Sequence, residues 1–137
     1  MPVALPCVAQ FVIVLDVTIV AIALPAMQAD LGLSTTALGG VLTAYTLVFG
    51  GCLLAAGRLA DRIGRRRAFG AGLLLFAAAS LACGLAPSGA ALLAARAVQG
   101  LGAALVSPAA LALVTAARPD GPGRARALGW WTAAVRP

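Results

Sequence analysis

Long apolar runs alternate with short polar segments along this chain. The runs occupy residues 6–27, 38–57, 68–86 and 90–117. A helix needs about 20 mainly apolar residues to cross the hydrocarbon core of a bilayer, so the pattern predicts four transmembrane helices. A fifth run, residues 127–135, begins in the same way but meets Arg136 and Pro137. Its helix would cover roughly 14 Å, less than half of that core.

Composition agrees with a membrane protein. The chain is 62% hydrophobic and 10% charged, whereas a soluble domain carries about 25% charged residues. We therefore predict an all-α, polytopic membrane helix bundle in the lipid bilayer of the cell (inner or plasma) membrane. The first run lacks a basic leader and contains Asp16, which argues against a signal peptide. The net charge of +6 comes from arginines, mostly in two interhelical segments, a pattern that argues against nucleic-acid binding.

The distribution of arginines predicts the orientation. Residues 58–67 hold five arginines and one aspartate, and residues 118–126 hold three arginines and one aspartate. The alternate connections, residues 28–37 and 87–89, are nearly uncharged. Because basic loops are retained on the cytoplasmic side, the arginine-rich segments and, by parity, the N-terminus are predicted to be cytoplasmic.

Two charged residues lie inside predicted spans, Asp16 in the first and Arg96 in the fourth. A charge at mid-membrane costs about 2.5 to 3.5 kcal/mol on insertion scales, so both side chains should face the bundle interior. We predict that they form an ion pair, directly or through water. Burial opposes the ionised carboxylate and a nearby arginine favours it, which suits a group that binds and releases a proton. The alternatives are that Asp16 is a structural polar anchor and that Arg96 snorkels to the outer interface.

The sequence offers few residues for metal binding or catalysis. Cys7, Cys52 and Cys83 all lie in apolar runs without metal-type spacing, and we interpret them as small packing residues. The chain has no histidine, and no nucleophile–base pair or metal constellation is recognisable. We therefore expect no enzyme, no metal site and no cofactor.

Small residues four positions apart predict close helix packing. Ala68 with Gly72, and Gly100 with Ala104, have this spacing. In lipid, such positions let helix backbones approach one another. We expect a tightly packed bundle.

Three motifs together resemble the major facilitator superfamily, in its 14-span drug:proton antiporter branch. The first is GRLADRIGRRRAF at residues 57–69, similar to the loop between spans two and three. Its residues at fixed family positions are Gly57, Leu59, Asp61, Arg62, Gly64 and Arg65. The second is LDVTIVAIALP at residues 15–25, which resembles the first-span motif. The third is RAVQGLGAA at residues 96–104, which includes Gln99 and Gly100 and resembles the fourth-span motif.

The resemblance implies a fold and residue roles. Residues 1–137 would form a partial N-terminal transmembrane bundle, the first four to five spans of a major facilitator fold. Arg96 would serve proton transfer with Asp16 as its partner. Asp61, Arg62 and Arg65 would lock helix ends and help control switching between inward and outward states. The proton gradient, rather than a cofactor, would drive transport of a small, drug-like substrate.

Two departures from the family pattern affect the expected activity. Ala21 stands where the branch often has an asparagine, and the Gly-Pro signature expected in the fifth span is absent from this chain. We expect a fragment of a proton-coupled exporter that works by alternating access, needs missing C-terminal helices or a partner chain, and is inactive alone. The alternatives are a complete four-span exporter that works as an oligomer, like the small multidrug exporters, and a non-transporting membrane scaffold.

Overall fold

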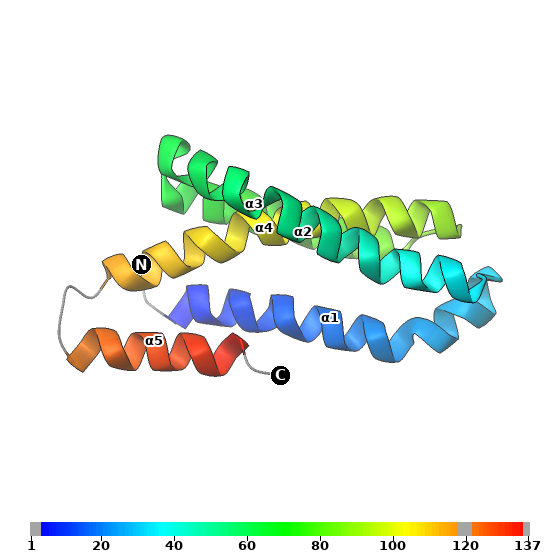
Figure 1. The fold of residues 1–137 in the computed structure, drawn as a ribbon, viewed down its shortest axis with the longest axis horizontal. Coiled ribbons are helices and arrows are strands. Elements are labelled where there is room, and N and C mark those ends of the chain that lie inside the picture. The colour runs from blue at the N-terminus through cyan, green and yellow to red at the C-terminus, as the bar shows by residue number, and fades with distance from the viewer. Residues whose placement is uncertain (1–3, 118–121, 136–137) are drawn as a thin grey trace.

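The structure is a computed structural model that describes residues 4–117 and 122–135, and these residues form five helices (Figure 1). The helices are α1 (Ala4–Leu31), α2 (Thr35–Ile63), α3 (Arg65–Gly84), α4 (Gly89–Ala116) and α5 (Pro122–Val135). Judged by length and composition, α1 to α4 are each long and apolar enough to cross a membrane. The predicted all-α class is confirmed, and α1 to α4 are candidate membrane spans that overlap the four predicted apolar runs.

The helices extend beyond several of the predicted apolar runs. Most of the predicted connection at residues 28–37 is helical, because α1 continues to Leu31 and α2 begins at Thr35. The Ser34 hydroxyl accepts a hydrogen bond from the Ala37 amide at 3.2 Å and caps α2. Ser88 caps α4 in the same way. The length of each apolar run reflects the thickness of a hydrocarbon core and not the full length of the helix. The capping residues Ser34 and Ser88 mark where α2 and α4 begin.

The arginine-rich segment at residues 58–67 is not the loop that the sequence predicted. Arg58 and Arg62 belong to the last turns of α2, and α3 begins at Arg65, so that only Gly64 separates the two helices. Gly64 has φ +95°, a conformation that favours glycine. Arginine is a good helix former, so polarity alone did not end the helix.

The second arginine-rich segment, residues 118–126, was also predicted as a loop. That interpretation is wrong for its C-terminal part, because α5 begins at Pro122 and includes Arg124 and Arg126. Residues 118–121 lie outside the described residues. Proline is well tolerated in the first turn of a helix, where its missing N–H has no helical partner.

Helix α4 forms the centre of the bundle and packs against α2, α3 and α1. Small residues make its contact with α3 close: a Cβ atom added to Gly102 would lie 2.7 Å from the Phe76 nitrogen. One added to Gly72 would lie 2.8 Å from the Leu105 Cβ. The predicted close packing is therefore confirmed. Four alanines and two valines of α4 are 0% exposed: Ala103, Ala104, Ala109, Ala110, Val106 and Val114.

The helices alternate in direction, which gathers their connections at two ends (Figure 1). The start of α1, the α2–α3 junction and the start of α5 lie at one end. The α1–α2 and α3–α4 connections lie at the other. The described arginines near the α2–α3 junction and at the start of α5 therefore share one end of the bundle. Helix α5 has 14 residues and packs beside α1.

Candidate functional site

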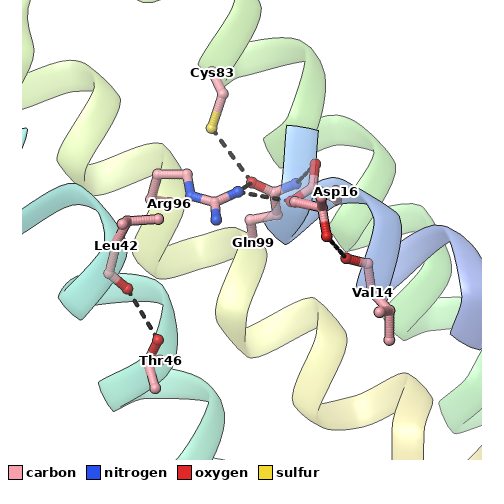
Figure 2. Close-up of polar contacts among 8 residues, drawn as sticks. Val14, Asp16, Leu42, Thr46, Cys83, Arg96 and Gln99 are labelled. Carbon is pink, nitrogen blue, oxygen red and sulfur yellow. Dashed lines mark hydrogen bonds and ion pairs between the residues drawn. The ribbon is translucent and has the colours of Figure 1, made fainter. Parts of the chain in front are cut away.

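Three polar side chains from α1 and α4 form a closed hydrogen-bonded network inside the bundle (Figure 2). Arg96 Nη1 donates to Asp16 Oδ2 at 2.8 Å and to Gln99 Oε1 at 2.6 Å. Gln99 Nε2 donates to Asp16 Oδ1 at 2.9 Å. Each side chain thus contacts the other two, and both oxygens of the carboxylate are engaged. The predicted Asp16–Arg96 ion pair is present and direct.

Helix geometry explains how the network assembles. Arg96 and Gln99 are three residues apart, so they lie on the same face of α4. Helix α1 packs on α4 and supplies Asp16 to that face. The resemblance to the family assigned Gln99 to the fourth-span motif. In the structure its side chain bridges the two charged groups, because it accepts from Arg96 and donates to Asp16.

Burial differs sharply across the ion pair. The Arg96 side chain is 1% exposed, and the Asp16 side chain is 16% exposed. The alternative in which Arg96 snorkels to the outer interface is therefore wrong, because the side chain is buried and pairs with Asp16 inside the bundle. A buried charge is tolerated when it is paired and hydrogen-bonded. Asp16 is the more accessible member of the pair.

Gly100 brings a third helix to the network. A Cβ atom at this position would lie 2.6 Å from the Tyr45 carbonyl oxygen and 3.3 Å from the Phe49 nitrogen, so only glycine allows α2 this close to α4. The close approach places the Tyr45 ring against Arg96, whose Cζ lies 4.5 Å from the ring centroid. This distance is in the range of a cation–π contact.

Sequence reasoning missed two members of this site. Tyr45 was not singled out, although it is the only tyrosine of the chain and lies in a span without charges. Cys83 was interpreted as a packing residue, but its Sγ also donates to Gln99 Oε1 at 3.5 Å. A thiol is a weak donor, so this contact adds orientation more than strength. Cys83, like the other two cysteines, is free.

A second polar contact joins α1 to α4, and the sequence analysis missed it too. Ser107 Oγ donates to Gln10 Oε1 at 3.0 Å, and Gln10 is buried. Gln10 lies six residues before Asp16 on α1, which is about 9 Å along a helix. Polar side chains therefore hold α1 against α4 at two levels.

Motif residues 57–65 lie in the last turns of α2 and at the start of α3, near the end of the bundle where the two helices meet and away from this network (Figure 1). Arg65 Nε pairs with Asp61 Oδ1 at 3.4 Å, and the side chains are 48% and 67% exposed. Arg62 is exposed in the last turn of α2. Gly57 faces α4, where an added Cβ would lie 3.9 Å from the Pro108 Cβ. The switching role of these residues stays a prediction.

The network combines a partly exposed carboxylate with a buried guanidinium and an amide that both donate to it. Among the described residues, no three histidine, cysteine, aspartate or glutamate side chains gather as a metal ion would require.

Comparison with known proteins places the chain in a family. Residues 7–136 match the model of the Major Facilitator Superfamily. The chain is 48% identical over 124 residues to the cephamycin export protein CmcT of Amycolatopsis lactamdurans, covering 90% of this chain and 26% of that protein. It is 52% identical over 121 residues to the puromycin resistance protein pur8 of Streptomyces alboniger, covering 88% and 24%.

A similar match is the multidrug resistance protein Stp of Mycobacterium tuberculosis (strain ATCC 25618 / H37Rv), 48% identical over 123 residues, with 90% of this chain and 23% of that protein covered. The chain thus spans about a quarter of the length of the curated relatives it matches. The matched region includes the buried network and the α2–α3 motif. With its apolar helices and its match over residues 7–136, the chain belongs to the Major Facilitator Superfamily and is a multi-pass membrane protein.

Proposed function

We propose that these helices belong to a proton-coupled exporter of small, drug-like molecules that works by alternating access. The observation that carries this proposal is the Asp16–Arg96–Gln99 network, in which a partly accessible carboxylate is held by a fully buried guanidinium. The names of the relatives support export: one is a cephamycin export protein and another a puromycin resistance protein. On this proposal the protein is a carrier rather than an enzyme.

The network couples the charge of Asp16 to the contact between α1 and α4. While Asp16 is ionised, its two oxygens accept from Arg96 and Gln99, and these bonds hold α1 on α4. When Asp16 takes a proton, its negative charge is lost. Arg96 then faces a neutral carboxyl group instead of a carboxylate, and the bond from Gln99 joins two neutral partners, so both contacts are weaker than in the ionised state. The proton remains on a carboxyl oxygen until Asp16 releases it. Protonation thereby loosens α1 from α4, and deprotonation restores the contact.

On this proposal the N-terminus lies in the cytoplasm, because the arginine-rich junctions gather at one end of the bundle and basic segments stay inside (Figure 1). Transporters of this kind bind substrate near the membrane midplane, between repeats of helices. Since the chain spans about a quarter of its relatives, further helices or a partner chain would complete the cavity. The driving force is the proton gradient.

The test is proton-driven efflux from proteoliposomes that contain the complete transporter formed with these helices. Asp16→Asn keeps the shape of the side chain but cannot be ionised, so we expect efflux to lose its dependence on the pH gradient. Arg96→Ala should have the same effect. Asp30→Asn is the matched control, because Asp30 is exposed near the end of α1. Undiminished pH dependence in both Asp16→Asn and Arg96→Ala would overturn the proposal.

A further inference from the structure

The buried guanidinium of Arg96 is only partly satisfied by the network. Its hydrogen bonds to Asp16 and to Gln99 both use Nη1. Its Nε and Nη2 atoms are buried without a hydrogen-bond partner among the described residues. An unsatisfied buried donor destabilises a structure, and one on a charged group does so more strongly. A group that offers electron density to this side of the guanidinium would offset that cost.

The ring of Tyr45 is the group in position to do so. Arg96 Cζ lies 4.5 Å from the ring centroid, and Tyr45 is itself 5% exposed. The face of an aromatic ring is electron-rich, and its attraction for a cation grows as water is excluded. Phe49, one turn further along α2, stacks on Tyr45 with ring centroids 6.0 Å apart and an interplanar angle of 5°. This stacking fixes the plane that Tyr45 presents to Arg96.

We propose that Tyr45 is a positioning residue that keeps the charged Arg96 guanidinium in place on α4 when Asp16 becomes protonated. This inference rests on the proposed function, in which Asp16 loses its negative charge during each cycle. The ring face offers its negative quadrupole in either state of Asp16. The contact between α2 and α4 through Tyr45 is then permanent, and the contact between α1 and α4 through Asp16 is conditional.

The first experiment follows the Arg96 guanidinium in the 137-residue chain, labelled with ¹⁵N-arginine in detergent micelles. A ring face shifts nearby protons upfield, and the Arg96 signal is assigned by its loss in Arg96→Lys. Asp16→Asn mimics the protonated state, and we expect it to retain the upfield shift. Tyr45→Phe should retain the shift and Tyr45→Leu should abolish it. Phe11→Leu, on the exposed side of α1, is the aromatic control and should leave the signal unchanged.

The second experiment separates the ring face from simple packing. Position 45 is occupied in turn by phenylalanine and by phenylalanines with increasing fluorination, which keep the shape of the ring but weaken its negative face. We expect the thermal midpoint of the Asp16→Asn chain to fall stepwise along this series. Equal midpoints would leave only a packing role and would overturn the proposal. So would loss of the upfield shift in Asp16→Asn, or a Tyr45→Phe chain that behaves like Tyr45→Leu.

Neither readout requires transport, so the two proposals fail separately. If efflux by the complete transporter keeps its dependence on the pH gradient in Asp16→Asn while the Arg96 signal keeps its upfield shift, the proton-coupling proposal is wrong and the ring contact stands. If efflux depends on Asp16 but the shift disappears in Asp16→Asn, the role of Tyr45 is wrong and the coupling proposal stands.

Discussion

Two aspartate–arginine pairs in this molecule use the same chemical groups in opposite surroundings. Asp16 and Arg96 come from different helices, lie 2.8 Å apart, and are 16% and 1% exposed. Asp61 and Arg65 are four residues apart in the chain, lie 3.4 Å apart, and are 67% and 48% exposed. The first pair lies inside the bundle, and the second lies at the junction of α2 and α3.

The comparison shows that burial, rather than pairing, determines how strongly an aspartate–arginine pair affects the packing and stability of the helices. Breaking a buried pair by removing one partner leaves an uncompensated charge and is strongly destabilising. An exposed pair contributes little, because water and salt replace its interaction. A change of charge at Asp16 therefore alters how two helices fit together. The exposed pair at the α2–α3 junction can form and break at small cost.

The largest expected effect comes from removing the buried arginine. Arg96→Ala leaves Asp16 charged and inside the bundle, so we expect the free energy of unfolding to fall by about 3 to 5 kcal/mol. The measurement is equilibrium unfolding of the chain in mixed micelles. Arg66→Ala, at an exposed position in the first turn of α3, is the control. A loss below about 1 kcal/mol, as expected for an exposed pair, would erase the contrast between the two pairs.

Removing the bridging amide should have the next largest effect. Gln99→Leu deprives Asp16 Oδ1 of its donor and Arg96 Nη1 of an acceptor. Hydrogen bonds to charged groups contribute about 1.5 to 3 kcal/mol, and we expect a loss in this range. The same unfolding assay measures it. A Gln99→Leu chain as stable as the unaltered chain would show that the ion pair does not depend on its bridge.

Widening the gap between α2 and α4 tests the packing that supports the buried pair. Gly100→Ala places a Cβ 2.6 Å from the Tyr45 carbonyl oxygen, so we expect overpacking to cost about 1 to 3 kcal/mol. Gly50→Ala is the matched control, because a Cβ there meets nothing within 4 Å. This control should gain up to about 1 kcal/mol from helix propensity. Equal effects of the two substitutions would contradict the close approach.

The smallest expected effect belongs to the exposed pair. Arg65→Ala should change the free energy of unfolding by about 0.2 to 1 kcal/mol, and raised salt should reduce that difference further. Unfolding at low and high ionic strength measures both. A loss above roughly 2 kcal/mol, more than an exposed pair contributes, would mean that the α2–α3 junction is held as firmly as the buried network.

Sequence alone predicted the parts of this structure that the bilayer dictates. The lengths of the apolar runs predicted four spans, because the hydrocarbon core sets how many residues are needed. The pairing of Asp16 with Arg96 followed because an intramembrane charge must find a partner. The resemblance to the superfamily added Gln99 and Gly100, and the structure shows that both belong to the surroundings of Arg96.

The contacts that sequence analysis missed depend on how each helix is rotated about its axis. Helix α1 is apolar on most sides, so its pattern does not reveal that Gln10 meets Ser107. The position of Tyr45 beside Arg96 depends on a glycine on another helix, Gly100. Helix ends were misplaced at residues 58–67, because arginine continues a helix as readily as it ends an apolar run.

The measurement that bears most directly on the buried pair is a double-mutant cycle in the 137-residue chain. It compares Asp16→Asn, Arg96→Met and the double variant by equilibrium unfolding in the same micelles. If the two side chains act as a buried pair, their effects will not add, and we predict a coupling energy of about 2 kcal/mol or more. Effects that add to within about 0.5 kcal/mol would mean that the two residues act independently. Asp16 and Arg96 would then not form the unit on which the proposed proton coupling depends.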